Sequence, residues 1–354
     1  MRTRGLVVGV VGAVLTLAAG LAGCGDVTST GSGGEPFTLP VGPTRWDASA
    51  PAWYADGTLH VGERSVELGD GVDEFVLGAT GAYWVRRQTL MFTSAEGRTR
   101  EVADVGWANL AVSADHSVVA TVDQSRGPTD EFGTHVMQVA VFDTRTGAQL
   151  YRTPDRAPAD GADLADLYGE LMPMLGGVSR DRVFFDEATI SLADGSREPV
   201  TQDDEGVDVY PGYAETLFTD GYHVGLRGEG RHREVGGSEA FGTGRLSPDR
   251  STVLDVGQWP TDAVAYDAET GRQRALDAPW DHFSLGGWTD DDTFFGVAER
   301  IDDHHPVDVL RARQVVTCEL RSLACTPVGR VIRTPDSADA ERPAFLLEGR
   351  VELL

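Results

Sequence analysis

The chain has 354 residues and a formal net charge of −26 at pH 7, because 56 aspartates and glutamates outnumber 30 basic residues, all of them arginine. This charge disfavours nucleic-acid binding, since neutralising phosphates requires a basic surface. With 41% hydrophobic residues, 24% charged residues and 43 glycines, the composition excludes a disordered or fibrous protein and indicates a chain that can bury a full core.

The first 23 residues have the order of an export signal. Arg2 and Arg4 form a short basic start, and Leu6–Leu21 forms an apolar run of about sixteen residues, which is short for a membrane-spanning helix. The run ends in Leu21–Cys24 (Leu-Ala-Gly-Cys), which resembles the lipobox of bacterial lipoproteins. The resemblance implies that Cys24 carries a diacylglyceryl group and that the chain is cleaved before it. An ordinary signal peptide with an incidental cysteine is the alternative.

The segment after Cys24 predicts a tether. Residues 24–44 are rich in Gly, Ser, Thr and Pro and lack hydrophobic periodicity, and such a chain reaches about 25 Å. Cleavage removes Arg2 and Arg4, so the net charge changes from −26 to −28, and an anionic lipid surface would repel the body. We therefore predict a signal peptide at 1–23, a lipidated cysteine and tether at 24–44, and a body at 45–354 on the extracytoplasmic face of the cell membrane.

The body has an all-β pattern of short apolar runs separated by Gly and Asp turns. One recurring unit is a strand of small residues that ends in Ser or Thr and is usually followed by an Asp turn. It occurs at 76–81, 109–115, 175–181, 216–220, 244–249 and 285–291. The five intervals from Thr80 to Thr289 average about 42 residues, a period typical of a β-propeller with four short strands per blade.

A second unit is a strand–turn–strand hairpin, clearest at Val141–Gly147 and Ala265–Gly271. Seven such turns occur, at Gly62, Gly97, Gly147, Gly195, Gly230, Gly271 and Ala324. We therefore predict seven blades of short antiparallel strands, with about 44 residues each, and six or eight blades as alternatives. The short strands Ala344–Leu347 and Arg350–Leu354 are predicted to complete the first blade, at Trp53–Leu68, so that the two termini pair and close the ring without an exposed sheet edge.

Two segments carry a resemblance to a known fold family. Leu246–Arg250 (Leu-Ser-Pro-Asp-Arg) and Tyr266–Gly271 (Tyr-Asp-Ala-Glu-Thr-Gly) resemble the repeats of TolB-like and WD-repeat-like propellers of exported bacterial proteins. The likeness covers most of residues 45–354. It implies the fold and leaves the activity open, because propellers have many unrelated functions.

The remaining two cysteines flank a short predicted turn. Cys318 and Cys325 stand at the ends of two strands, which would bring their sulfur atoms together, and an exported protein is in an oxidising compartment. We predict a structural disulfide. A two-cysteine metal site is the alternative, although the loop between them contains no His or Asp.

Two insertions interrupt the repeats. Gln124–His135 is a polar loop, and Asp160–Leu175 carries apolar residues at helical spacing: Leu164, Leu167, Leu171 and Met174. The second insertion is the only predicted helix. One hypothesis is a helix that caps the propeller with its leucines buried, and the other is a lid or a docking helix for a partner.

Motifs for common catalytic and cofactor sites are absent. No Gly-x-Ser-x-Gly elbow, His-Glu-x-x-His pair, Walker loop or dinucleotide fingerprint occurs, so we predict no catalytic residue and no cofactor. The histidines are scattered except for His304 and His305, which together with Asp302 could offer ligands to a cation. Because adjacent loop residues rarely face one ion, no metal site is assigned.

Two charged residues stand among small ones in the predicted innermost strands. Glu215 and Arg245 are therefore candidates to face the central channel, where propellers often bind ligands. An ion pair between the strands is the simpler interpretation. Glycoside chemistry would need a second acid facing the same substrate, and the sequence identifies none.

Together these features predict a membrane-anchored, extracytoplasmic β-propeller lipoprotein that acts as a non-catalytic binding or scaffold module in the cell envelope. Its predicted partners are the lipid bilayer, through acylated Cys24, and an envelope protein or polymer. An envelope glycan hydrolase or lyase with acids at the channel mouth is one alternative. A small-ligand or cation receptor is another.

Overall fold

The computed structural model describes residues 38–105, 109–113, 115–171, 173, 175–202, 208–209, 216–219, 223–226, 233–237, 243–247, 251–256, 261–262, 264–267, 272–280, 282–302, 309–334 and 344–349. The chain divides into two units, Met1–Ser32 and Gly33–Leu354, and every described residue belongs to the second. The predicted signal peptide and Cys24 thus lie outside the described residues.

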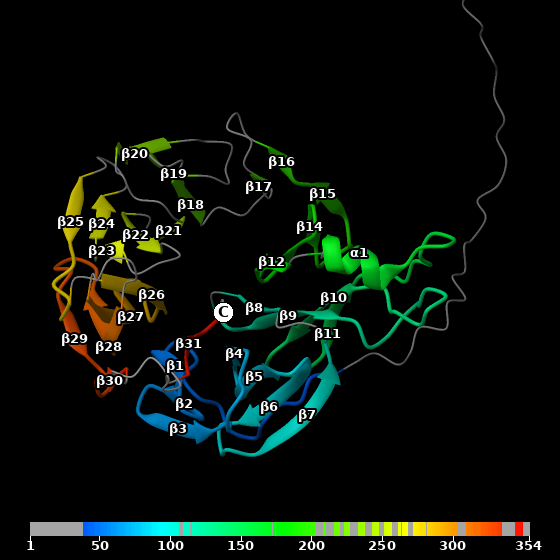
Figure 1. Cartoon of the computed structure of the whole chain (residues 1–354), viewed down its shortest axis with the longest axis horizontal. Helices are drawn as coiled ribbons and strands as arrows, with labels where there is room; N and C mark the ends of the chain where they lie inside the picture. Colours follow the sequence, from blue (N-terminus) through cyan, green and yellow to red (C-terminus); the bar gives the residue numbers. More distant parts are fainter. Residues whose placement is uncertain are drawn as a thin grey trace, which may run out of the picture. The chain divides into compact units, whose positions relative to one another are not determined.

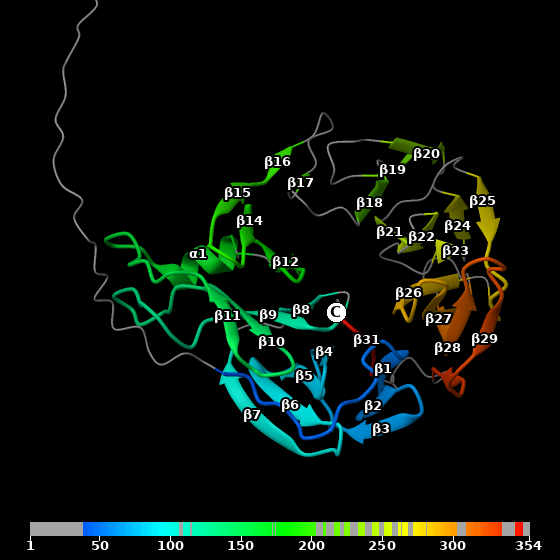
Figure 2. The ribbon, with the colours of Figure 1, turned by 180° about the vertical axis from the view of Figure 1, so that it is seen from behind.

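The first antiparallel sheet contains a strand from each end of the body. Its order is β3-β2-β1-β31, formed by β1 (Ala52–Ala55), β2 (Thr58–Val61), β3 (Arg64–Glu67) and β31 (Phe345–Leu347). Tyr54 of β1 pairs with Leu346 of β31, and the two strands lie side by side in both views (Figures 1 and 2). The predicted pairing of Ala344–Leu347 with the first blade is therefore present, while residues 350–354 lie outside the described part of the chain.

Three further sheets each use four strands in chain order. The second is β4 (Glu74–Gly78), β5 (Gly81–Arg86), β6 (Thr89–Ser94) and β7 (Thr99–Asp104). The third is β8 (Leu110–Val112), β9 (Val118–Asp123), β10 (Gln138–Asp143) and β11 (Gln149–Arg152). The fourth is β12 (Leu175–Val178), β13 (Arg182–Phe185), β14 (Ala188–Ser191) and β15 (Arg197–Pro199), and the short helix α1 (Leu164–Glu170) precedes it.

The other strands form one small sheet and two larger ones. The small sheet pairs β16 (Thr201–Gln202) with β17 (Asp208–Val209). A seven-stranded sheet has the order β20-β19-β18-β21-β22-β24-β25, from β18 (Thr216–Thr219), β19 (His223–Leu226), β20 (Arg233–Gly237), β21 (Thr243–Leu246), β22 (Thr252–Val256), β24 (Val264–Asp267) and β25 (Gln273–Ala275). The last has the order β23-β26-β27-β28-β29, with β30 on β28, from β23 (Thr261–Asp262), β26 (His282–Trp288), β27 (Thr293–Asp302), β28 (Val309–Glu319), β29 (Cys325–Pro327) and β30 (Ile332–Arg333).

The six small-residue units of the sequence all form strands, namely β4, β8, β12, β18, β21 and β26. In the second, third and fourth sheets this strand lies at one edge, and the edge strands of consecutive sheets contact one another, β31 with β4, β4 with β8, and β8 with β12. The predicted turn chemistry is also present, because Ser113 Oγ donates to Asp115 and Ser179 Oγ donates to Asp181.

The hairpin turns fall where the sequence places them. Gly62, Gly97, Gly147 and Gly195 each have a positive φ and separate β2 from β3, β6 from β7, β10 from β11 and β14 from β15. Gly147 is required for a second reason: a Cβ there would lie 2.0 Å from the carbonyl oxygen of Leu39. Leu39 N also donates to the Gly147 carbonyl at 2.9 Å, and Leu39 is buried. Contact with the sheets thus begins inside the range predicted as the tether.

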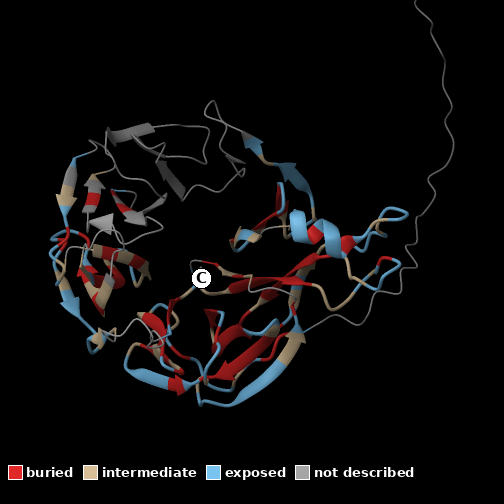
Figure 3. Ribbon diagram, in the orientation of Figure 1, coloured by how far each residue is buried: buried red, intermediate tan, exposed pale blue. Residues whose placement is uncertain are grey.

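The hydrophobic core lies between consecutive sheets. One cluster joins the first and second sheets and contains Tyr54, Trp84 and Leu346. Others join the second sheet to the third and the third to the fourth. A further cluster joins Phe295 and Val315 of the last sheet to strands of the first sheet. Accordingly, the strands facing neighbouring sheets are buried, whereas β3, β7 and β15 are largely exposed (Figure 3).

Helical structure is sparse in the described residues. α1 spans seven residues, and no helix in these ranges has the length and apolarity needed to cross a membrane.

Candidate functional site

Several of the predicted site residues lie outside the part of the chain that the structure describes. Glu215, His304 and His305 lie outside the described residues, as does Cys24. Arg245 lies in β21, with its backbone opposite Thr216 of β18. Asp302 ends β27 and accepts a hydrogen bond from Arg311 Nε at 2.7 Å. Within the described ranges no group of three or more His, Cys, Asp or Glu side chains could hold a metal ion.

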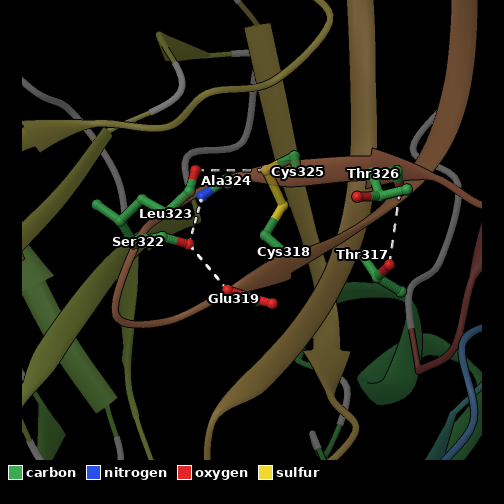
Figure 4. The surroundings of a disulfide bond; sticks show 8 residues. All are labelled: Thr317, Cys318, Glu319, Ser322, Leu323, Ala324, Cys325 and Thr326. Atoms are coloured by element: carbon green, nitrogen blue, oxygen red, sulfur yellow. Dashed lines mark hydrogen bonds between the residues drawn. A yellow bond between two sulfur atoms is a disulfide. The ribbon is translucent and has the colours of Figure 1, made fainter.

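The predicted disulfide is present (Figure 4). Cys318 of β28 and Cys325 of β29 pair directly across the ladder, with their Cα atoms 4.0 Å apart. In the connecting turn, Ala324 N donates to Ser322 Oγ and Ser322 Oγ donates to Glu319. Because the sulfur atoms are bonded to each other, the alternative of a two-cysteine metal site is wrong.

Replacing both cysteines, Cys318→Ala with Cys325→Ala, is expected to lower the free energy of unfolding by about 2 kcal/mol, since the bond restricts the unfolded chain. Urea unfolding with and without reductant measures this effect. Reductant should lower the wild type to the level of the double variant and leave that variant unchanged. A wild type insensitive to full reduction of the bond would contradict a structural role.

A carboxylate that the sequence did not single out connects three sheets. Glu348 follows β31, and its Oε1 accepts a hydrogen bond from Leu77 N of β4 at 2.6 Å. Its Oε2 lies 3.1 Å from Nε2 of His116, in the turn between β8 and β9. Both side chains are only about one-eighth exposed (13% for His116 and 12% for Glu348). Glu348 thus ties the end of the chain to the second and third sheets.

The surroundings of His116 favour its charged form. Burial lowers the pKa of the imidazole, but the Glu348 carboxylate raises it by charge and hydrogen bonding, and Asp115 and Asp47 add to this effect. The net result is a raised pKa, so the His116–Glu348 contact has the character of an ion pair over a wider pH range than an isolated histidine would allow.

Glu74, the first residue of β4, is a second acid that joins two sheets. Its side chain is 2% exposed, and Oε2 accepts a hydrogen bond from Leu110 N of β8 at 2.8 Å. Burial raises the pKa of this carboxyl to about 8, although the Leu110 hydrogen bond opposes the shift. Glu74 is therefore mostly protonated at neutral pH.

Asp115 forms the next link between sheets. Its carboxylate accepts hydrogen bonds from Ser113 and Ser117 within its own turn and from Arg180, which follows β12 in the fourth sheet. Burial raises the pKa of Asp115, but these hydrogen bonds outweigh it and hold the pKa well below its usual range.

These three acids share one structural role. Glu348, Glu74 and Asp115 each accept a hydrogen bond from the next sheet along the chain. Two carboxyl groups that hydrolyse a glycoside must both face the substrate. The carboxyl groups of Glu348, Glu74 and Asp115 instead accept hydrogen bonds from backbone amides and a side chain of the neighbouring sheet. Their chemistry fits attachment between sheets.

A different feature, on the outside of the third and fourth sheets, offers contacts to a partner. We call it the loop–helix surface: the loop 124–136 between β9 and β10, and the segment 153–171 that contains α1. Asp163 caps α1 by accepting from Ala165 N and Asp166 N, each at 3.1 Å. Leu164 and Tyr168 are the residues of α1 that are buried.

The predicted burial of the helix leucines is only partly right. Leu164 is buried, but Leu167 is 45% exposed and Leu171 is 72% exposed. The rotation follows from Tyr168, whose ring is buried while its hydroxyl accepts a hydrogen bond from Met137 N at 2.9 Å. Leu164 and Tyr168 therefore face the core, whereas Leu167 and Leu171 are exposed to solvent.

The loop beside α1 is fixed by Asp130. This buried carboxylate accepts from Phe132 N and Thr134 N in its own loop, and from Leu164 N at the start of α1 at 2.9 Å. Phe132, at the tip, is 66% exposed. Below the loop, Arg152 pairs with Asp123, and the fully buried Gln138 donates to Asp155 at 2.7 Å. The exposed side chains thus stand on a hydrogen-bonded base.

No family model matches the chain, and no curated protein matches it in sequence. Among solved structures it is similar to TolB from Agrobacterium tumefaciens, at 9% identity and a TM-score of 0.35 over 80% of this chain and 88% of that one. It is also similar to a puromycin-hydrolysing peptidase from Mycobacterium tuberculosis (14%, 0.44, over 83% of this chain and 57% of that one) and to BamB from Moraxella catarrhalis (9%, 0.38, 71% and 79%). These likenesses are remote, and no activity is carried over from them.

The class of the fold follows from the sheets themselves. Four-stranded antiparallel meanders succeed one another along the chain, with small-residue strands at the contacting edges. The chain thus resembles a TolB-like or WD-repeat-like β-propeller.

Proposed function

We propose that the protein is a lipid-anchored, extracytoplasmic propeller that acts as a non-catalytic binding or scaffold module of the cell envelope. The observation that carries the binding role is the loop–helix surface, where Phe132, Leu167 and Leu171 are exposed on a hydrogen-bonded base. Exposed apolar patches are typical of protein interaction sites, and this surface carries three of the seven large hydrophobic side chains that the described residues leave exposed.

The ring in this proposal has seven blades. Support comes from the sheets: four have four strands each, and the last contains β26–β29. The seven-stranded sheet would supply two blades, β18–β20 and β21-β22-β24-β25, which pair through β18 and β21. Closure between the last blade and the first is supported by the β1–β31 pairing and by the core cluster that joins Phe295 and Val315 to Trp53 and Phe345. A closed ring leaves no long sheet edge open to aggregation.

The absence of catalysis in the proposal rests on how the inner acids are used. Glu74 and Glu348 accept hydrogen bonds from backbone amides of the neighbouring sheet, and Asp115 accepts one from the side chain of Arg180. A glycan hydrolase or lyase is the alternative that this use of the acids disfavours. It predicts cleavage of purified envelope glycan by the wild type and a loss of that cleavage in a Glu348→Gln variant.

Lipid anchoring at Cys24 is tested by fractionating bacteria that produce the full-length chain. Two acyl chains, at about 0.8 kcal/mol per buried CH₂, suffice for stable membrane attachment. The wild type is expected almost entirely in the membrane fraction, with the mass of a chain that starts at Cys24 and carries the lipid. A mature chain without the lipid mass, or a wild type that a high-salt wash releases from the membrane, would overturn the lipid anchor.

A further inference from the structure

We propose that the loop–helix surface is the docking site for a basic, amphipathic segment of a partner protein. This inference rests on the proposed binding function and specifies the chemistry of the partner. It is argued from the exposed side chains of residues 124–136 and 153–171, from their charge and from the rigidity of their base.

The apolar part of the surface is unusual for this chain. The described residues leave seven large hydrophobic side chains exposed, and three of them, Phe132, Leu167 and Leu171, belong to the loop–helix surface. These three include the two most exposed, at 72% for Leu171 and 66% for Phe132. Leu167 belongs to α1 and Leu171 is its C-cap, whose backbone N–H donates to the Leu167 carbonyl, so the two residues lie close together at the end of the helix. The surface offers an aliphatic pair with an aromatic side chain on the adjoining loop.

The charged part of the surface is mostly negative. Only one exposed arginine, Arg156, belongs to the described residues of the two segments. The exposed acids of these segments are Glu131, Asp155, Asp160, Asp163, Asp166 and Glu170. A partner that covers the leucines brings its own side chains next to these carboxylates, so complementarity requires arginine or lysine around an apolar stripe.

The base holds these side chains in place before a partner arrives. Asp130 joins the loop to the start of α1, and the Tyr168 hydroxyl joins α1 to Met137, the residue before β10. Arg152 pairs with Asp123 at the end of β9 and donates to the carbonyl of Arg126 in the loop, and Gln138 donates to Asp155 in the second segment. Side chains that are already held in place lose less conformational entropy when a partner binds. This favours a binding site for a partner at these exposed side chains.

Other occupants fit the same surface poorly. An anionic lipid surface would face the six acids and be repelled. A second copy of this chain, placed by two-fold symmetry, would set the same acids against one another. A basic amphipathic segment satisfies both the leucines and the carboxylates.

The test uses the full-length chain in detergent and a synthetic helical peptide of leucine and arginine arranged with one apolar face. A scrambled peptide of equal composition and a peptide with glutamate in place of arginine are the comparisons. Binding is measured by fluorescence anisotropy. The wild type should bind the amphipathic peptide at least about tenfold more tightly than either comparison, and added salt should weaken this binding.

Two protein variants separate docking from unspecific charge attraction. Leu167→Gln with Leu171→Gln keeps every acid and is expected to lose about tenfold in affinity. Val328→Gln with Val331→Gln, at two exposed valines elsewhere, is the matched control and should bind like the wild type. Circular dichroism shows that each variant is folded. Equal binding by the leucine variant, equal binding of the scrambled peptide, or no binding by the wild type would overturn the proposal. A partner captured in cells through this surface despite such a result would leave the binding function intact and refute only the partner's chemistry.

Discussion

Glu74→Gln is expected to be more stable than the wild type at pH 8 and to lose most of this advantage at pH 5, with a change of about 3 kcal/mol between the two pH values. The reason is the burial of Glu74 in β4, which raises the pKa of its carboxyl to about 8 from 4.5. The amide of glutamine can still accept the hydrogen bond from Leu110 N.

The sign follows from proton binding. Between pH 4.5 and pH 8 the unfolded chain has released the Glu74 proton while the folded chain still holds it, so the free energy of unfolding falls as the pH rises. Below pH 4.5 both states are protonated and the penalty disappears. A glutamine does not titrate, which removes this slope and leaves any constant cost of the amide unchanged.

The measurement is urea unfolding of both proteins at several pH values from 5 to 8. Glu101→Gln, at an exposed position of β7, is the matched control and should follow the wild type throughout. A constant difference between Glu74→Gln and the wild type across this range would show that Glu74 ionises freely in the folded protein, contrary to its buried position.

Leu346→Ala is expected to lower the free energy of unfolding by about 3 kcal/mol, because it leaves a cavity between the first and second sheets. Leu346 is 3% exposed and belongs to the cluster that contains Tyr54 and Trp84. Its strand, β31, also carries Glu348 to the second and third sheets, so loosening it weakens those contacts as well.

Leu150→Ala is the matched control, since this leucine of β11 is 43% exposed. It is expected to change stability by less than about 0.5 kcal/mol. Both variants are compared with the wild type by urea unfolding and by the rate of limited proteolysis near the C-terminus. If Leu346→Ala costs no more than Leu150→Ala, the terminal strand is dispensable and its role in joining the two ends of the body is refuted.

The strands and turns were predictable because their causes are local. A glycine such as Gly147 supplies the positive φ of its turn. Asp115 accepts hydrogen bonds from hydroxyl and amide groups of its own turn. Each turn can therefore be recognised from a few consecutive residues of the sequence. The pairing of Phe345–Leu347 with β1 followed from a different argument, the need to complete a blade that lacks a strand.

The contacts between sheets were not predictable in the same way. Glu74 binds an amide 36 residues away and Glu348 binds one 271 residues away, and no local pattern distinguishes these acids from the other 54. What distinguishes Glu74 and Glu348 is their position at the start of β4 and just after β31. This position indicates a contact between sheets only when the arrangement of the sheets is known. The rotation of α1 was missed for a similar reason, since Tyr168 is buried through a distant amide, that of Met137.

The binding role of the loop–helix surface has a direct test, because the chain contains no lysine. Arg156→Lys would introduce a single lysine in the exposed segment that leads to α1, and Arg64→Lys in β3 would introduce one at another exposed position. Bacteria that produce each full-length variant, or the wild type, are treated with an amine-reactive cross-linker, and the products are sized by mass spectrometry.

A discrete covalent adduct with one envelope component is predicted for Arg156→Lys and is absent from Arg64→Lys and the wild type. Any adduct formed through the α-amino group is common to all three proteins. Adducts of equal yield from both lysine variants, or no adduct from Arg156→Lys, would contradict a binding function at this surface.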